Sequence, residues 1–442
     1  MYRYFMNYLD ARASDPRRVP LLLRGARQIG KSHTLREYGS RLGRRVVEVN
    51  FELRPELEQC FRSRQPDEIL RQLEAVTGLT IEDRSTVLFI DEIQESNDAL
   101  MALRAFKELR PQLDVVAAGS LIDFALNDGR LNSFPVGRIA FAWMHPMSFQ
   151  EFLMALGEDK IAESCALSTV DKPPAPAIHS KMLSLVRLYY MLGGMPEVVS
   201  TYLETKSILA ASRIQTRLGL GFSADFAKYG ARYDHRKLQK ILASAPRRVG
   251  MQFKFSHVDP DTKARDLKAP LADLERAGLI RRIPAVSGNG LPLAAEERDG
   301  IFKIQMLDIG LMLNTLGLSI STMPLESALF INEGALAEQF VGQELLAYAD
   351  PEQPPQIYYW SREAKGAEAE VDFVIAHGGR PVPVEVKAGA TGSLRSLRQF
   401  MLDKKCRVGV RFSQHPLSLV DGILSIPLYM VGSLSRLLDS HV

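Results

Sequence analysis

The sequence feature that most constrains the fold is an eight-residue stretch near the amino terminus. Residues 25–32 read Gly-Ala-Arg-Gln-Ile-Gly-Lys-Ser and fit the pattern G-x-x-x-x-G-K-S. An apolar run, residues 19–23, precedes the stretch, and a helix-like segment, residues 31–38, begins at its end. This strand–loop–helix setting is the one that a phosphate-binding loop requires. A glycine-rich turn without a ligand is the alternative, and the fully filled pattern disfavours it.

Each position of this loop has an expected role in holding ATP and Mg²⁺. Glycine has no Cβ, so the loop backbone can wrap closely around a polyphosphate. Backbone N–H groups of the loop and of the following helix then point at the phosphates. Lys31 is expected to reach the β- and γ-phosphates, and the Ser32 hydroxyl to ligate Mg²⁺. The predicted nucleotide contacts are Gly25, Ala26, Arg27, Gln28, Ile29, Gly30, Lys31 and Ser32.

Strand-like and helix-like segments alternate after the loop. Residues 46–51, 87–90 and 115–120 read as strands, and residues 55–77 and 97–110 read as helices. The continuous apolar run at 87–90 is typical of a strand that is covered on both faces. Strands alternating with helices predict a parallel α/β sheet.

Polar residues at the ends of two of these strands are candidates for ATP chemistry. Ligands of open α/β sheets bind at the carboxyl ends of the strands. Asp91 follows the apolar strand and is expected to hold Mg²⁺, while Glu92 is placed to polarise the attacking water. Ser120 ends the next strand and is expected near the γ-phosphate. A solvated turn is the alternative for Asp91 and Glu92, and the upstream phosphate loop favours the functional interpretation there. A plain strand-to-helix turn explains Gly119 and Ser120 about as well.

Arg138, at the end of a loop over residues 132–138, is a candidate arginine finger. Such an arginine stabilises charge on the transferring phosphoryl group. A surface arginine in a turn explains the pattern equally well. An arginine supplied to a neighbouring subunit would require a homo-oligomer, which the sequence does not prove.

The composition is that of an ordinary globular protein, with 46% hydrophobic and 24% charged residues. The scattered cysteines Cys60, Cys165 and Cys406 have neither zinc-site spacing nor a disulfide framework, so a cytoplasmic location is expected. The first ten residues lack the apolar core of a signal peptide. Since no apolar run approaches the ~20 residues needed to span a bilayer, no membrane partner is expected.

Positive charge is concentrated in residues 230–285. This segment holds thirteen Lys and Arg against six Asp and Glu, an excess of seven, while the whole chain has a net charge of +3. Its pattern is a helix (235–245), a second helix (262–277) and a strand-like run (279–283), which looks like a winged helix-turn-helix. Phosphate contacts with DNA would suit this charge. A helical packing module with a solvated basic face is the alternative.

A second group of chemical residues lies near the carboxyl terminus. Residues 370–375 and 382–387 read as paired strands, and Glu385 and Lys387 share one strand face. Asp372 lies on the partner strand, and Glu338 lies on the apolar face of a helix. These four residues are a candidate Mg²⁺ site for cleaving a phosphodiester. Cross-strand ion pairing on a half-exposed hairpin is the alternative.

Together these motifs resemble a prokaryotic family of AAA-type ATPases, in which an AAA_14-like P-loop domain is followed by a domain called DUF4143. The resemblance covers nearly the whole chain and rests on the loop at 25–32 and on the segments 89–94, 137–138, 146–152, 193–196, 307–311, 370–373 and 384–389. It implies an ATP-hydrolysing core with Walker-A roles for Lys31 and Ser32, Walker-B roles for Asp91 and Glu92, and a sensor role for Ser120. It also implies that Glu338, Asp372, Glu385 and Lys387 match the PD-(D/E)xK nuclease core.

The expected architecture has four parts. These are an AAA-like P-loop ATPase domain (1–155), a helical lid (156–225), a winged helix-turn-helix-like segment (226–290) and a nuclease-like α/β domain (291–442), with the DUF4143 region over about 180–390. The function expected first is a Mg²⁺-dependent ATPase whose nucleotide state controls a DNA-linked carboxyl-terminal part. The alternatives are a nucleotide-switched protein-binding module with little turnover and an active Mg²⁺-dependent nuclease.

Overall fold

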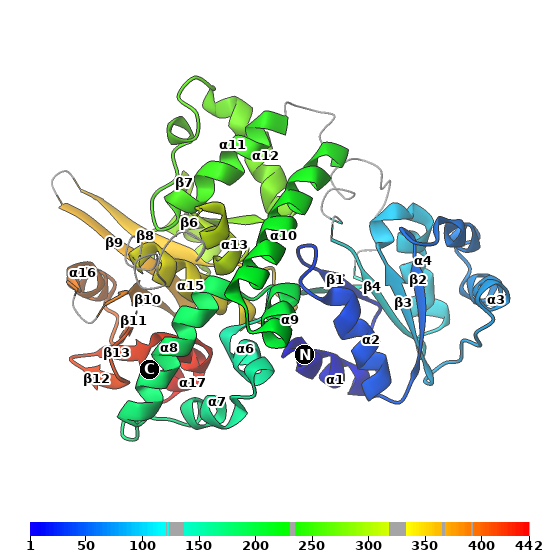
Figure 1. Ribbon diagram of the computed structural model, residues 1–442, viewed down its shortest axis with the longest axis horizontal. Coiled ribbons are helices and arrows are strands. Elements are labelled where there is room, and N and C mark those ends of the chain that lie inside the picture. The colour runs from blue at the N-terminus through cyan, green and yellow to red at the C-terminus, as the bar shows by residue number, and fades with distance from the viewer. Residues whose placement is uncertain are drawn as a thin grey trace. The chain divides into compact units, whose positions relative to one another are not determined.

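The computed structural model describes residues 1–120, 122, 137–229, 235–317, 333–364, 367–389 and 392–441. The chain divides into two compact units, whose ribbon is drawn in Figure 1. Unit 1 holds residues 1–145, 276–278 and 349–355, and unit 2 holds residues 146–275, 279–348 and 356–442.

Unit 1 is built on a five-stranded sheet in the order β2-β3-β4-β1-β5, and all of its strand pairs are parallel. The predicted parallel-sheet P-loop fold is therefore confirmed. The elements are α1 (Phe5–Ser14), β1 (Leu21–Arg24), α2 (Lys31–Arg41), β2 (Arg45–Asn50), η1 (Pro55–Phe61), α3 (Pro66–Thr77), β3 (Thr86–Asp91), η2 (Ile93–Glu95), α4 (Asn97–Leu109), β4 (Asp114–Ala118) and β5 (Ala140–Trp143).

Helices cover both faces of this sheet (Figure 1). Side chains of a strand alternate between faces, and Val47, Val49, Leu88 and Ile90 pack with residues of α3 and α4 in one hydrophobic cluster. Helix α2 contacts β2, β3 and β4, and α1 packs against α2. Burial on both faces explains why β3 is apolar from Val87 to Ile90.

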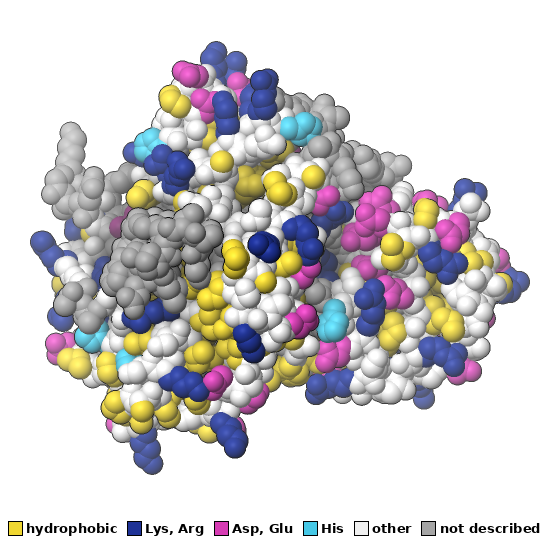
Figure 2. Space-filling model, in the orientation of Figure 1, with side chains coloured by type: hydrophobic (Ala, Val, Ile, Leu, Met, Phe, Trp, Pro, Cys, Tyr) yellow, Lys and Arg dark blue, Asp and Glu magenta, His cyan; other side chains and the backbone are white. Residues whose placement is uncertain are grey.

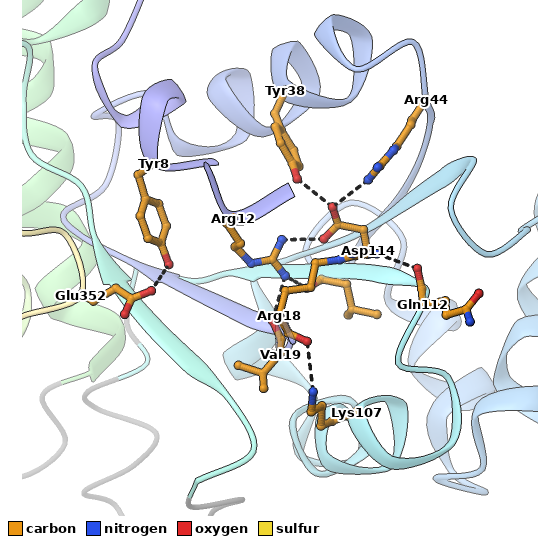
Figure 3. A network of polar contacts seen from close by, with 11 residues as sticks. Tyr8, Arg12, Arg18, Val19, Tyr38, Arg44, Lys107, Gln112, Asp114 and Glu352 are labelled. Atoms are coloured by element: carbon orange, nitrogen blue, oxygen red, sulfur yellow. Dashed lines mark hydrogen bonds and ion pairs between the residues drawn. The ribbon is translucent and has the colours of Figure 1, made fainter. Parts of the chain in front are cut away.

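A buried polar network ties α1 and α2 to the start of β4 (Figure 3). Asp114 is fully buried, and its carboxylate accepts hydrogen bonds from Arg12 at 2.6 Å and from the Tyr38 hydroxyl at 2.7 Å. Arg44 adds a third contact at 3.3 Å. Burial alone would raise the pKa of Asp114, but the ion pair with Arg12 and the hydrogen bonds from Arg12 and Tyr38 hold it below its ordinary value.

Replacement of Asp114 by Asn should therefore destabilise unit 1. The variant leaves the buried Arg12 guanidinium without its carboxylate, which costs about 3–5 kcal/mol in buried ion pairs. The measurement is the urea midpoint of the chain, and Asp15→Asn, which changes only exposed contacts with Arg17, is the control. Equal midpoints for the two variants would contradict this role of Asp114.

Unit 2 is organised around an eight-stranded mixed sheet in the order β12-β13-β11-β10-β9-β8-β6-β7. Its strands are β6 (Ile280–Val286), β7 (Glu297–Met306), β8 (Tyr358–Ala364), β9 (Ala367–His377), β10 (Arg380–Val386), β11 (Gly409–Ser413), β12 (Ser418–Val420) and β13 (Ile423–Pro427). The pairs β6–β8, β10–β11 and β11–β13 are parallel, and the other pairs are antiparallel.

Helices account for most of the remaining described residues of unit 2. They are α6 (Phe149–Leu156), α7 (Asp159–Ala166), α8 (Pro176–Leu192), α9 (Pro196–Thr205), α10 (Ile208–Tyr229), α11 (His235–Ser244), α12 (Ala264–Arg276), α13 (Ile309–Thr315), α15 (Glu333–Ala347), α16 (Arg395–Lys404) and α17 (Leu434–Asp439), with the short helices η3 (Ala245–Arg248), η4 (Phe255–His257), η5 (Leu293–Glu296) and η6 (Leu428–Ser433). In the described part of the chain, every helix is too short or too polar to cross a membrane.

The two units divide the chain differently from the four expected parts. Helix α6 groups with unit 2, although the P-loop domain was expected to extend to residue 155. Helices α11 and α12 and the antiparallel hairpin β6–β7 occur in the order expected of a winged helix. This hairpin is not a free wing, because β6 also pairs with β8 and so joins the eight-stranded sheet. Residues 132–136 of the expected loop, and Arg232 and Asp234 of the basic segment, lie outside the described residues.

Candidate functional site

Polar residues from neighbouring strands gather at the carboxyl edge of the unit 1 sheet. Strand β1 leads into the loop at residues 25–32, Asp91 ends β3, and Ser120 lies two residues beyond β4. Asn50, which ends β2, lies at the same edge. Because all strand pairs of this sheet are parallel, the strands end side by side at the place where ligands of such sheets bind.

Two positions of the loop require glycine, because the backbone there has a positive φ or lies very close to another segment. Gly25 has φ 137°, and a Cβ there would lie 2.4 Å from the carbonyl oxygen of Met144. Gly30, the residue before α2, has φ 94°, in the left-handed region that favours glycine. Gln28 also has a positive φ of 64°, a conformation that is uncommon outside glycine. The loop therefore forms the backbone cradle that its sequence predicts.

Lys31 is a buried cation at the centre of this cradle. Its side-chain nitrogen donates hydrogen bonds to the carbonyl oxygens of Gly25 at 3.0 Å and Ala26 at 2.7 Å. It has no ion pair with any described residue. Burial lowers the pKa of Lys31 to about 8, and the nearby carboxylates of Glu92 and Asp91 offset only part of this effect. A phosphate group placed here would supply the missing negative charge.

Ser32 and Asp91, the predicted ligands of Mg²⁺, are in direct contact. The Ser32 hydroxyl donates a hydrogen bond to Asp91 at 2.8 Å, and the Asn50 amide donates to the same carboxylate oxygen at 3.2 Å. Two adjacent oxygens of an octahedral Mg²⁺ shell also lie about 2.9 Å apart, given bonds of ~2.0–2.1 Å. Burial raises the pKa of Asp91, while the Ser32 hydrogen bond acts in the opposite direction. These oxygens therefore fit the ion.

Glu92 is held in place by a residue that the sequence did not single out. Its backbone is left-handed, with φ 52°, and its N–H donates to the Asp91 carboxylate at 3.1 Å. The Gln94 amide donates to the Glu92 carboxylate at 2.6 Å. Gln94 lies against Gly119, where a Cβ would be only 2.3 Å from the amide oxygen. The only sequence signal for Gln94 is its place in the motif after β3.

Ser120 and Arg138 lie in different places relative to this edge. The Ser120 hydroxyl accepts a hydrogen bond from Arg27 of the loop at 3.2 Å, so it lies beside the cradle. Arg138 precedes β5, at the amino-terminal edge of the sheet, because Ala140 pairs with Leu21 at the start of β1. Its side chain contacts Glu108, near the end of α4, at 3.2 Å. Within one chain Arg138 is therefore at the edge opposite the loop, and a role in another subunit remains a prediction.

Of the residues predicted for the second cluster, Glu338 and Asp372 contact a lysine of unit 2 that the sequence pattern did not indicate. The ammonium group of Lys303, on β7, lies 2.9 Å from Glu338, 2.7 Å from Glu370 and 3.6 Å from Asp372. Lys387 pairs with Glu385 at 2.6 Å. The expected Mg²⁺ site is thus organised around an ammonium group. Among the described residues, no group of three or more His, Cys, Asp or Glu is placed to hold a metal.

Burial and mutual repulsion control the charges of this cluster. Burial raises the pKa of Glu338 to about 7, and burial together with the Asp372 charge raises the pKa of Glu385 to about 8. Burial alone would lower the pKa of Lys303, but the surrounding carboxylates outweigh it and hold that pKa well above its ordinary value. Lys303 therefore remains charged.

Models of known protein families match several parts of the chain. A model described as an AAA domain matches residues 17–153, and one described as domain of unknown function DUF4143 matches residues 333–431. The chain therefore contains an AAA domain and a DUF4143 domain. A third model, domain of unknown function DUF8612, matches residues 183–322, a stretch in which the DUF4143 region had been expected to begin.

Several solved structures match parts of this chain at low sequence identity. The Walker-type ATPase PABY2304 of Pyrococcus abyssi is 16% identical over 71% of this chain and 95% of its own, with a TM-score of 0.45. The RuvB Holliday junction branch migration motor of Thermotoga maritima is 15% identical over 63% and 88%, with a TM-score of 0.27. The Aeropyrum pernix ORC1 protein in complex with DNA is 14% identical over 74% and 95%, with a TM-score of 0.25. No curated protein matches the chain.

The lowered pKa of Lys31 predicts that ATP binding takes up a proton in mildly alkaline solution. Above about pH 8 the Lys31 amine of the free protein is largely neutral. Phosphate charge raises its pKa, so the amine must gain a proton when ATP binds. The apparent Kd should then weaken by up to tenfold per pH unit until the bound-state pKa is passed. Calorimetry at about pH 9 in two buffers of different ionisation enthalpy counts the protons.

Lys31→Arg provides the control, because a guanidinium group stays charged throughout this range. That variant should bind ATP, if more weakly, without proton uptake. An unmodified protein that takes up no proton would contradict the proposed environment of Lys31.

Proposed function

We propose that this protein is a Mg²⁺-dependent ATP hydrolase. The observation that carries the proposal is the convergence of Lys31, Ser32, Asp91 and Glu92 at one edge of the parallel sheet. A hydrogen bond joins Ser32 to Asp91, and two hydrogen bonds to loop carbonyl oxygens hold the buried Lys31 ammonium in place. Such an arrangement is suited to binding a polyphosphate and its counter-ion, which is most of what phosphoryl transfer requires of a protein.

In this proposal the side chains have separate tasks. Backbone N–H groups of the loop hold the phosphates, and Lys31 moves its hydrogen bonds from the carbonyl oxygens of Gly25 and Ala26 to the phosphate oxygens. Ser32 and Asp91 would hold Mg²⁺, which would supply positive charge beside the phosphates. Glu92 orients the attacking water and accepts its proton. Ser120 contacts the γ-phosphate or this water.

A nucleotide-switched binding module is the second candidate, and the Gln94–Glu92 hydrogen bond favours it. At 2.6 Å this bond occupies one carboxylate oxygen of the expected base. If the bond persists with ATP bound, it makes Glu92 a weaker base and leaves one carboxylate oxygen for the water. ATP would then bind and change the state of the protein with little turnover.

Substitutions at Lys31 and Glu92 separate these candidates. Lys31→Ala should reduce Mg²⁺-dependent ATP hydrolysis to background, since the loop loses the buried cation that the phosphates would contact. Glu92→Gln should keep ATP binding and reduce turnover by roughly 10²–10⁴-fold, the usual contribution of a general base. Phosphate release and binding of a fluorescent ATP analogue are the two measurements.

Glu95→Gln is the matched control for Glu92→Gln, because Glu95 is a nearby exposed glutamate. Its turnover should equal that of the unmodified protein. Turnover that survives Lys31→Ala would refute the hydrolase proposal, whereas slow turnover that Glu92→Gln leaves unchanged would favour the switch.

We also propose that the basic surface around α11 and α12 contacts DNA. Lys254, Lys263 and Lys268 are exposed and form no ion pair with described residues, and Figure 2 shows Lys and Arg side chains gathered over these helices. Other cations of the segment are partly neutralised, as in the pairs Lys240–Asp259 and Arg282–Glu275. The chain runs from α12 into a short segment of unit 1, where a Cβ at Gly278 would lie 3.3 Å from that of Ala26.

Removing two of these lysines should weaken DNA binding through its salt-dependent part. Lys263→Ala/Lys268→Ala should reduce affinity for duplex DNA regardless of sequence, and should lower the slope of log K against log salt by about 1 per lost phosphate contact. Lys160→Ala/Lys172→Ala, which removes two exposed lysines outside the segment, is the control. Equal losses in the two double variants, or no binding at low salt, would reject this surface.

A further inference from the structure

The acidic cluster of unit 2 is arranged around the ammonium group of Lys303. This side chain is fully buried, and its nitrogen contacts carboxylates from two different elements. Glu338 comes from α15, while Glu370 and Asp372 come from β9. The nitrogen also lies 5.2 Å from the centre of the Tyr359 ring, a distance suited to a cation–π contact. Every neighbour named here favours positive charge at this point.

Oxygens that a metal ion would use are already engaged. Glu338 and Glu370 each direct one oxygen at Lys303 within 3 Å, and one oxygen of Asp372 lies 3.6 Å from it. The other Asp372 oxygen accepts the backbone N–H of Val386 at 2.8 Å. These are distances of hydrogen bonds and ion pairs, whereas Mg²⁺ draws its oxygen ligands to ~2.0–2.1 Å.

One buried oxygen of the cluster lacks a hydrogen-bond partner among the described residues. Glu385 is 5% exposed and uses one carboxylate oxygen for Lys387. Its second oxygen, Oε2, is buried and has no hydrogen-bond partner among the described residues. Such an atom loses its hydration without compensation, so a bound cation or proton would stabilise it.

We propose that the Lys303 ammonium group is the resident cation of this cluster and excludes a divalent ion from its carboxylates. Removing the ammonium leaves the carboxylates of Glu338, Glu370 and Asp372 uncompensated beside the unpartnered oxygen of Glu385. Several hard oxygens around one point suit Mg²⁺ or Mn²⁺. The cluster in this protein is therefore a divalent-cation site closed by its own lysine.

Mn²⁺ binding followed by electron paramagnetic resonance tests this proposal. All variants carry Asp91→Asn, so that the nucleotide site contributes little. The Asp91→Asn parent should bind no Mn²⁺ that depends on Asp372. Adding Lys303→Ala should create one site that binds at least tenfold more tightly than any residual binding, and adding Asp372→Asn to that variant should abolish it.

Two further variants keep the test decisive. Lys303→Met retains the length of the side chain without its charge, and it replaces Lys303→Ala if circular dichroism shows that the alanine variant does not fold. Lys240→Ala removes a lysine that pairs with Asp259 elsewhere in unit 2, and it should create no site. Asp372-dependent Mn²⁺ binding by the parent would overturn the proposal, and so would a folded Lys303 variant that binds no Mn²⁺.

Discussion

The nucleotide site depends on one close approach between backbone segments in unit 1. Gly25 passes so near the carbonyl oxygen of Met144 that no side chain fits at residue 25. This contact places the end of β1 against the segment that follows β5, and the loop then turns back into α2. Any larger residue would displace the loop from the strand ends that carry Asp91 and Ser120. The glycine therefore positions groups far from it in sequence.

The loop and the strand ends of unit 1 could be predicted because short sequence patterns specify them. The loop pattern has fixed spacing, and strand ends of a parallel sheet share one edge, so Asp91 and Ser120 were expected beside Lys31. Asn50 ends β2 in the same way and could have been found by the same argument. Gln94 could not, because its contact with Glu92 depends on a left-handed turn and on the absence of a side chain at Gly119.

The acidic cluster was only half predictable because it depends on strand order. Asp372, Glu385 and Lys387 are neighbours on a hairpin, which a sequence pattern can indicate. Lys303 lies on β7, and β8 and β6 separate that strand from β9 in the sheet. Nothing local to residues 301–306 specifies this order. The pairing of β6 with β8 could not be predicted for the same reason, since it joins residues more than 70 positions apart.

Two buried lysines show how environment decides what a charged residue does. Burial opposes the charge of both, yet the pKa of Lys31 falls and that of Lys303 rises. The difference lies in the carboxylates of the described residues, which contact Lys303 directly but do not contact Lys31. A buried lysine without a contacting anion carries the cost of desolvating its charge, and a phosphate ligand can offset that cost. A lysine enclosed by carboxylates already has its counter-charge. The same residue type therefore opens one site to an anion and closes the other to a metal ion.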